Sequence, residues 1–273
     1  MQVKTIQGTE VLIEGTGEET ILMLHGWPDT RALWEPQVAA FKANYRCVRF
    51  TWPGFEPGAP KQEHPLDALI ALCEAVVREV SPGKPVILMV HDWGCLFGYQ
   101  FATRHPELVS RVVGVDIGDA SSRDFRKATT VPALLGIVSY QLWLAGAWRV
   151  GGGVGENMSR WLARLMGVPT PVDSITVAKN YPYFSMWTGK YKAAKTFRPT
   201  CPMLFIYGKR KPFMFHSPQW EAMLNARPGS QAIGMDADHW PMLRRPDEFN
   251  AIVLRWLASQ PSNEAPNASS AVL

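Results

Sequence analysis

The stretch from Val86 to Gly94 constrains the fold of this chain more than any other. It reads Val-Ile-Leu-Met-Val-His-Asp-Trp-Gly, so an apolar run ends abruptly in polar and small residues, and a helical pattern follows over residues 96–104. A buried strand that turns sharply into a helix exposes one reactive side chain at the turn, and serine is the usual residue there. In this chain the residue is Asp92, a carboxylate.

Apolar runs of strand length alternate with helical patterns along the chain. Continuous apolar strands separated by helices predict a mostly parallel sheet covered on both faces, and the first two strands form a hairpin. The expected strands are 3–6, 11–14, 20–25, 46–51, 86–90, 112–117, 201–207 and 231–235. The expected helices of this core are 33–42, 66–80, 96–104 and 249–257.

The rhythm changes between residues 120 and 199, where the chain is aromatic, helical in pattern and punctuated by glycine. We therefore expect a core formed by 1–119 and 200–260, with 120–199 inserted as a helical cap. The Gly-rich run 151–155 has no preceding strand, so it predicts a turn rather than a dinucleotide loop. Residues 261–273 are rich in Ser, Asn, Ala and Pro, which predicts a disordered tail.

The composition excludes several functional classes. Hydrophobic residues make up 47% of the 273 residues, and the net charge is only +4 without a basic stripe, which argues against a nucleic-acid partner. The N-terminus lacks the pattern of a signal peptide, and no apolar run reaches the ~18 residues of a membrane span. Four cysteines without a CxxC pair predict buried thiols in a reducing, cytoplasmic setting, with no metal site and no cofactor.

Two motifs and a late histidine carry a resemblance to a known superfamily. His25-Gly26-Trp27-Pro28, His91-Asp92-Trp93-Gly94 and His239 occur in the order found in α/β-hydrolases. The chain resembles their Asp-nucleophile branch, which contains epoxide hydrolases and haloalkane dehalogenases, and it is closest to the epoxide hydrolases. Over residues 3–257 the resemblance implies the α/β-hydrolase fold: a mostly parallel eight-stranded sheet, helices on both faces and an inserted helical cap.

The resemblance also implies a chemistry. A carboxylate at the turn attacks sp³ carbon and forms an alkyl ester, which water must then hydrolyse. By resemblance, the oxyanion hole consists of the backbone N–H groups of Trp27 and Trp93, and His239 is the base that activates water. The alternative for Asp92 is a helix N-cap, a position that Asp favours.

The acid that orients His239 departs from the usual pattern. Many relatives carry it in a turn after the seventh strand, but here that turn reads Gly208-Lys209-Arg210-Lys211, which we interpret as a solvated turn. Dehalogenases of this branch carry the acid instead 24 residues after the nucleophile. That position is Asp116, which we expect to complete the triad, with Asp119 as the second candidate.

We expect the residues of the cap to determine whether the substrate is an epoxide or a halide. Tyr140 lies in a Tyr-Gln-Leu segment like that of soluble epoxide hydrolases, and by distance from Pro202 the second proton donor is Tyr181. Pro182 interrupts the second motif, so Tyr183 is its alternative. Gln141 and Tyr183 are expected to contact the substrate, and the tryptophan-rich cap favours an apolar molecule.

The sequence thus predicts an enzyme that opens small apolar epoxides to vicinal diols with water. Asp92 forms the ester and His239 with Asp116 hydrolyses it. One alternative is a haloalkane dehalogenase with the same triad, in which Trp93 donates to the halide. A second is a non-catalytic ligand-binding protein, suggested by Val90 at a usually small position. The sequence gives no indication of oligomeric state.

Overall fold

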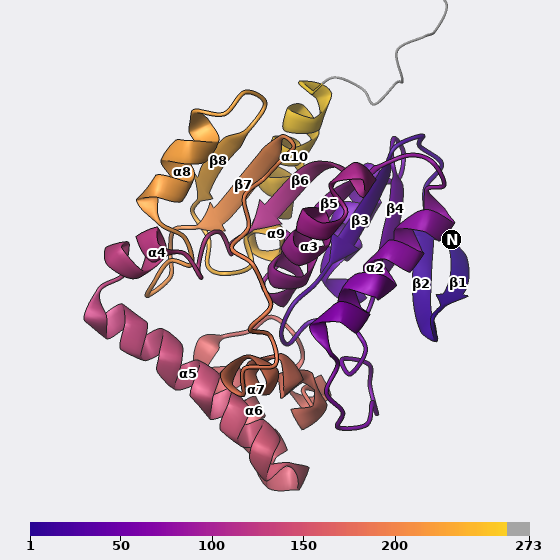
Figure 1. Ribbon diagram of the computed structural model, residues 1–273. Helices are drawn as coiled ribbons and strands as arrows, with labels where there is room; N and C mark the ends of the chain where they lie inside the picture. The colour runs from indigo at the N-terminus through magenta and orange to yellow at the C-terminus, as the bar shows by residue number, and fades with distance from the viewer. Residues whose placement is uncertain (261–273) are drawn as a thin grey trace, which may run out of the picture.

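The computed structural model describes residues 1–260, so the tail predicted at 261–273 lies outside the described residues. Its centre is one sheet of eight strands in the order β1-β2-β4-β3-β5-β6-β7-β8 (Figure 1). The strands are β1 Gln2–Ile6, β2 Thr9–Glu14, β3 Thr20–Leu24, β4 Arg46–Phe50, β5 Val86–His91, β6 Val109–Val115, β7 Met203–Gly208 and β8 Gln231–Met235.

Only the edge of the sheet formed by the hairpin is antiparallel. β1 pairs with β2, and β2 with β4, in antiparallel register, while every other neighbouring pair is parallel. Parallel strands end at the same edge of a sheet, so the residues that follow β3, β5, β6 and β7 meet there. The predicted fold class, mostly parallel with eight strands, is confirmed.

Helices cover both faces because the inner strands are buried on both sides, as β3 and β5 are at every position, whereas the edge strand β1 is mostly exposed. One buried cluster joins the sheet to α2, α3 and α8, and a second joins its other face to α1, α9 and α10. The bounds are α1 Glu35–Phe41, α2 Leu66–Val80, α3 Trp93–Arg104, α8 Pro218–Asn225, α9 Pro241–Arg244 and α10 Pro246–Ala258. Two short 3₁₀ turns, Arg31–Trp34 and Pro106–Leu108, complete the core.

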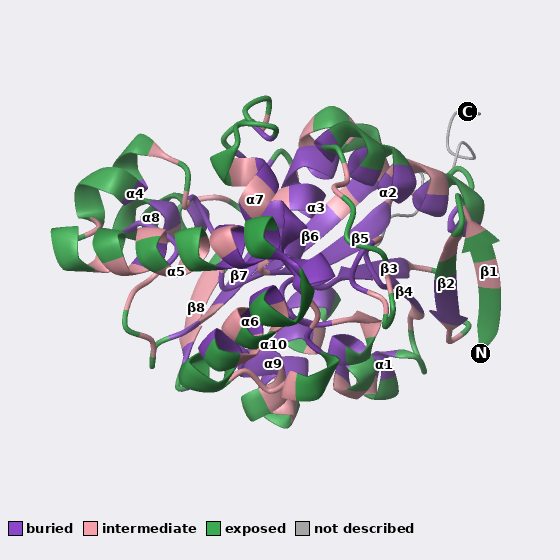
Figure 2. Cartoon of the chain, turned by 90° about the horizontal axis from the view of Figure 1, so that it is seen from below, coloured by how far each residue is buried: buried purple, intermediate pink, exposed green. Residues whose placement is uncertain are grey.

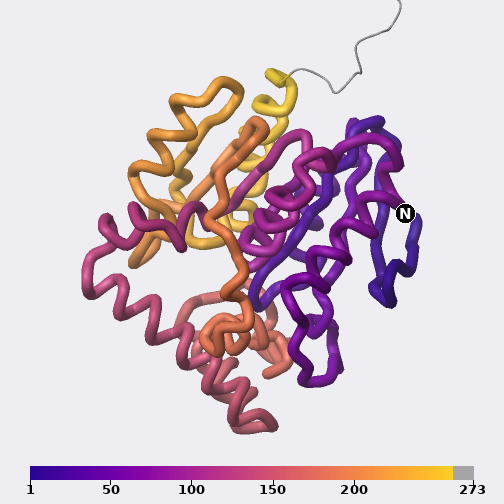
Figure 3. The backbone as a smooth tube through the Cα atoms, viewed as in Figure 1, coloured from indigo at the N-terminus to yellow at the C-terminus, as the bar shows by residue number. Residues whose placement is uncertain are grey.

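Between β6 and β7 the chain leaves the sheet and returns (Figure 3). This described stretch contains no strand. It forms α4 Arg123–Ala128, α5 Val131–Val150, α6 Gly152–Met166, two 3₁₀ turns at Val172–Ser174 and Val177–Asn180, and α7 Tyr181–Trp187. α5, α6 and α7 lie together at one end of the sheet (Figure 1), and in the view from that side they lie toward β6, β7 and β8, away from the β1–β2 hairpin (Figure 2).

Among the described residues, α5 is the one helix long and apolar enough to cross a membrane by length and composition alone. One such helix is weak evidence, because a helix of a soluble protein passes the same test. Leu144, Ala147 and Trp148 of α5 are buried against the rest of the protein, whereas Val131 and Leu135 are exposed. The expected lack of a membrane span stays a prediction.

Candidate active site

Asp92 stands at the turn between β5 and α3 with a strained backbone. Its φ of 53° and ψ of −122° lie in a region that non-glycine residues rarely adopt. It occupies the N-cap position of α3, yet its side chain makes no capping hydrogen bond. The side chain keeps 14% of its surface exposed, so the carboxylate can be reached from outside. This geometry fits a reactive group better than a helix cap.

The turn is possible because three glycines surround it. A Cβ on Gly26 would lie 2.3 Å from Asp92 Oδ1, and one on Gly94 would lie 2.4 Å from the Leu24 carbonyl oxygen. Gly98 makes room for Val90, because a Cβ there would lie 2.7 Å from Val90 Cγ1. The chain therefore accommodates the larger residue before the turn with a glycine in the helix after it.

A backbone N–H group binds one oxygen of the Asp92 carboxylate. The Trp27 N–H donates to Asp92 Oδ1 at 2.7 Å, and Trp93, the second expected donor, follows Asp92 directly in the chain. Burial alone would raise the pKa of Asp92, but the hydrogen bond and the charge of His239 outweigh it and hold the pKa below its usual value. Asp92 is thus ionised, and its Oδ2 remains available to react with a substrate.

His239 bridges two carboxylates. Its Nε2 lies 3.5 Å from Asp92 Oδ2, and its Nδ1 hydrogen-bonds Asp116 Oδ2. Burial lowers the pKa of His239, but the charges of Asp116 and Asp92 outweigh burial and raise it to about 9. The imidazole keeps 16% of its surface exposed, which leaves room for a water molecule beside it. The structure therefore brings Asp92, His239 and Asp116 together in one line.

Asp119 lies elsewhere and has other partners. It accepts hydrogen bonds from the Ser217 N–H and hydroxyl, both at 2.7 Å, and from the Ser122 hydroxyl at 2.7 Å. These contacts tie the start of the cap to the segment before α8. Of the two candidate acids, only Asp116 contacts the His239 ring.

The turn after β7 is not simply solvated. Lys209 and Arg210 are exposed, but the Lys211 side chain is only 4% exposed and its Nζ lies 2.5 Å from Asp116 Oδ1. The prediction of a solvated turn is therefore wrong for Lys211. The side chain folds inward because the fully buried Asp116 carboxylate needs a counter-charge.

Two cap tyrosines gather beside Trp93, the residue that follows Asp92. Tyr140 of α5 and Tyr183 of α7 have ring centroids 6.1 Å apart, and Tyr183 lies edge-on to Trp93 at 5.0 Å. Burial, and next the charge of Asp92, raise the pKa of both hydroxyls well above the usual value. Both therefore carry their proton at neutral pH. Gln141, the second predicted substrate contact, lies with its Nε2 3.4 Å from the Tyr140 hydroxyl.

Tyr181 is not part of this group, which corrects the assignment made by distance along the chain. Its ring packs against Phe55 at 5.8 Å and His64 at 5.0 Å, and its buried hydroxyl has no hydrogen-bond partner. Positions two apart on a helix point about 200° away from each other. When α7 turns Tyr183 toward Asp92, it turns Tyr181 away.

Several functional contacts were not expected from the sequence. The Trp27 indole N–H donates to Asn180 Oδ1 at 2.8 Å, so the cap fixes the loop that carries the oxyanion N–H. Asp29 accepts from the Trp240 indole at 3.0 Å, and burial raises the pKa of Asp29 to about 6. Asp29 directly follows His25-Gly26-Trp27-Pro28 in the sequence, and this position could have identified it as a residue of the site.

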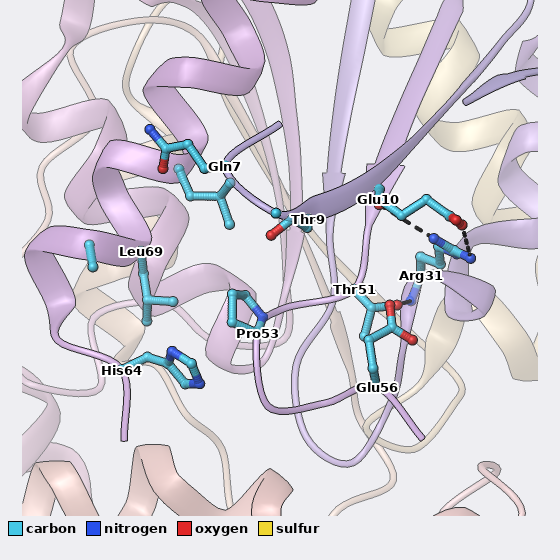
Figure 4. A pocket seen from close by; sticks show the side chains of 12 residues that line it. Gln7, Thr9, Glu10, Arg31, Thr51, Pro53, Glu56, His64 and Leu69 are labelled. Atoms are coloured by element: carbon cyan, nitrogen blue, oxygen red, sulfur yellow. Dashed lines mark hydrogen bonds and ion pairs between the residues drawn. The ribbon is translucent and has the colours of Figure 1, made fainter. Parts of the chain in front are cut away.

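A surface pocket of about 550 Å³ lies away from these residues (Figure 4). It is formed by the β1–β2 turn, the segment after β4 and one side of α2. Its lining contains the Glu10–Arg31 ion pair at 2.6 Å, and includes neither Asp92 nor His239. The pocket is thus separate from the site described above.

Comparison with known proteins agrees with this geometry. Residues 21–252 match the model of the alpha/beta hydrolase family. "Epoxide hydrolase srdG" of Neurospora crassa is 34% identical over 99 residues, which are 34% of this chain and 29% of that protein. "Epoxide hydrolase 4" of Mus musculus is 30% identical over 103 residues, 37% of this chain and 28% of its own length. The chain therefore matches less than a third of each of these two relatives.

Solved structures extend the likeness to the whole fold. A mutant of an epoxide hydrolase from Bacillus megaterium superposes with a TM-score of 0.66 at 19% identity, covering 94% of this chain and 100% of the other. Identity at that level supports the fold alone.

Proposed function

Because this chain belongs to the alpha/beta hydrolase family, we propose that it hydrolyses epoxides to vicinal diols through an ester on Asp92. One observation carries the proposal. Asp92 has one oxygen bound by the Trp27 N–H, His239 contacts its other oxygen, and the charge of Asp92 acts on the hydroxyls of Tyr140 and Tyr183. The names of the two relatives given above, both epoxide hydrolases, support the same substrate class.

The first step forms the ester. Asp92 Oδ2 attacks one epoxide carbon and the C–O bond of the ring breaks. Tyr140 and Tyr183 donate hydrogen bonds to the leaving oxygen and supply its proton. Both hydroxyls carry their proton across the neutral range, so each has a proton to donate to the ring oxygen.

The second step releases the diol. His239 takes a proton from water, and the hydroxide attacks the Asp92 carbonyl carbon. The oxyanion is stabilised by the Trp27 N–H, which already binds this oxygen, and by the Trp93 N–H, which the family resemblance assigns as the second donor. The intermediate then collapses, the ester C–O bond breaks, and the departing alkoxide takes the proton back from His239.

Dehalogenation is the second candidate, because the same triad can displace a halide. A halide needs free N–H donors, and here the Trp27 indole N–H is committed to Asn180 Oδ1, while the Trp93 ring packs edge-on against Tyr183 at 5.0 Å. Two tyrosines beside Trp93 suit an emerging alkoxide better than a halide ion. The epoxide is therefore the substrate class that the site favours.

An assay with a terminal aryl epoxide and a matched bromoalkane separates the candidates. We expect diol from the first and no bromide from the second; bromide alone would overturn the proposal. In His239→Gln the ester should accumulate, adding the mass of the epoxide to the peptide that contains Asp92. Binding of the epoxide without any adduct or diol would instead favour a ligand-binding protein.

A further inference from the structure

Lys211 is a buried cation that the steps above do not use. Its ammonium lies 2.5 Å from Asp116 Oδ1, the oxygen that also accepts the Gly208 N–H at 3.0 Å. The other oxygen of Asp116 binds His239. Asp116 is fully buried, so its two oxygens divide between a fixed cation on one side and the imidazole on the other.

Phe215 holds both partners of Asp116 in place. The Lys211 Nζ lies 5.6 Å from the centre of the Phe215 ring, and the same ring meets His239 at 5.9 Å. A cation over an aromatic ring is stabilised where water is excluded. The lysine is thus a built part of the site and not a surface chain that happens to fold inward.

A count of charges indicates what the lysine does. With Asp92 and Asp116 ionised and Lys211 charged, the group is neutral when His239 carries a proton, in agreement with the raised pKa of His239. Once Asp92 is esterified its charge is gone, and the neutral state becomes the one with a neutral imidazole. Without Lys211, the esterified site would be neutral only with His239 protonated, and a protonated imidazole cannot act as a base.

We propose that Lys211 is the counter-ion of the triad acid, a positioning residue that holds Asp116 toward His239 and makes the imidazole neutral when the ester must be hydrolysed. This inference rests on the proposed ester mechanism. Formation of the ester then releases the His239 proton, which balances the proton taken up by the opened ring oxygen. Lys211 acts on the second step and leaves the first almost unchanged.

Other charged groups also face His239 and must be kept constant in the test. His91 donates from Nε2 to the His239 carbonyl at 2.9 Å, and burial lowers the pKa of His91 to about 4. The charge of Asp29 acts on His239. The charge of His216 acts on Asp116. None of these replaces the ammonium, because none contacts Asp116.

The test compares Lys211→Met with Lys209→Met, an exposed lysine of the same turn, and with Lys211→Arg, which keeps the charge. In Lys211→Met we expect the His239 pKa, followed by NMR without substrate, to rise by about one unit or more. Ester hydrolysis in single turnover should slow at neutral pH, by up to about 10-fold for each unit by which the His239 pKa of the esterified enzyme rises. Ester formation should change little.

Lys209→Met should match the native protein, and Lys211→Arg should recover most of the rate and of the His239 pKa. An unchanged His239 pKa and an unchanged rate of ester hydrolysis in folded Lys211→Met would overturn the inference. The NMR titration needs no substrate, so a failure of the epoxide assay with a shifted His239 pKa would count against the proposed function alone. If Lys211→Met does not fold, Lys211→Gln takes its place in the same titration.

Discussion

The two halves of the site are held by different kinds of structure. Asp92 and Asp116 follow directly after strands β5 and β6, where paired backbones fix each residue, and both have positive φ. Tyr140 and Tyr183 come from α5 and α7, whose positions depend on how cap helices pack. The end of a paired strand fixes which residue occupies a given position. In a packed helix, by contrast, the rotation of the helix decides which of two nearby residues occupies that position.

The two halves of the site also differ in their proposed chemical roles. In the proposed mechanism, the strand-end half contains the groups that form and break the ester, and the strands that carry these groups belong to the buried core. In the same mechanism the cap half supplies the proton donors, whose loss slows the reaction without removing the nucleophile. Substitutions in the two halves should therefore differ in size.

The largest effect is expected at the strand end. Asp92→Ala removes the nucleophile and should lower kcat by about 10³-fold or more, since direct attack by water lacks the covalent step. The measurement is diol formed from an aryl epoxide, with thermal unfolding as the control for folding. Residual activity within about 10-fold of the native protein would mean that Asp92 is not the nucleophile.

The cap is tested by a matched pair of tyrosines two residues apart. Tyr183→Phe removes a proton donor while Tyr140 remains, and kcat/KM should fall about 10- to 100-fold, less than the roughly 10²- to 10⁴-fold of a general acid because one donor is left. Tyr181→Phe removes a hydroxyl that has no partner and should change kcat/KM less than about 3-fold, because no contact to the substrate is lost. A larger loss of kcat/KM in Tyr181→Phe than in Tyr183→Phe would identify Tyr181 as the donor.

The pH dependence of the free energy of unfolding tests the strand-end half of the site without a substrate. The pKa of His239 is about 9 in the folded protein, against an ordinary value of 6.5, so its contribution is complete below pH 6.5 and is lost as pH rises through 9. The free energy of unfolding should therefore decline between these values by roughly 1–3 kcal/mol. In His239→Gln this decline should be much smaller; an equal decline would show that another group titrates.

The smallest effect concerns the packing under the turn. Gly98→Ala places a Cβ 2.7 Å from Val90 Cγ1 and should destabilise the fold by about 1–3 kcal/mol. Val90→Ala removes that methyl group, so the double variant should recover part of the loss. Additive effects in urea unfolding would mean that the two residues do not share this contact.

The sequence predicted the strand-end half well because its signals are local. An apolar run that stops at His91-Asp92 specifies strand, turn and nucleophile together, and a fixed spacing led from Asp92 to Asp116. Among the inner strands, β3, β5 and β7 were likewise readable because they are largely apolar. The family resemblance implied Trp27 and Trp93 as backbone donors, and the Trp27 N–H donates to Asp92 Oδ1 at 2.7 Å.

Other features depend on packing that no short pattern encodes. Pro182 lies at the start of α7, and the rotation of that helix decides between Tyr181 and Tyr183. Lys211 looked like part of a solvated turn because its buried partner, Asp116, is 95 residues earlier. The tie between Trp27 and Asn180 spans 153 positions. Such contacts become visible only when the cap lies on the core.

The most direct test of an ester on Asp92 is a single turnover in H₂¹⁸O, with enzyme in excess over epoxide. Mass spectrometry then locates the label in the diol and in the peptide that contains Asp92. We predict an unlabelled diol, whose new oxygen comes from Asp92, and one ¹⁸O atom in the Asp92 carboxylate. A labelled diol with an unlabelled Asp92 would mean that water attacks the epoxide directly, and would contradict the account.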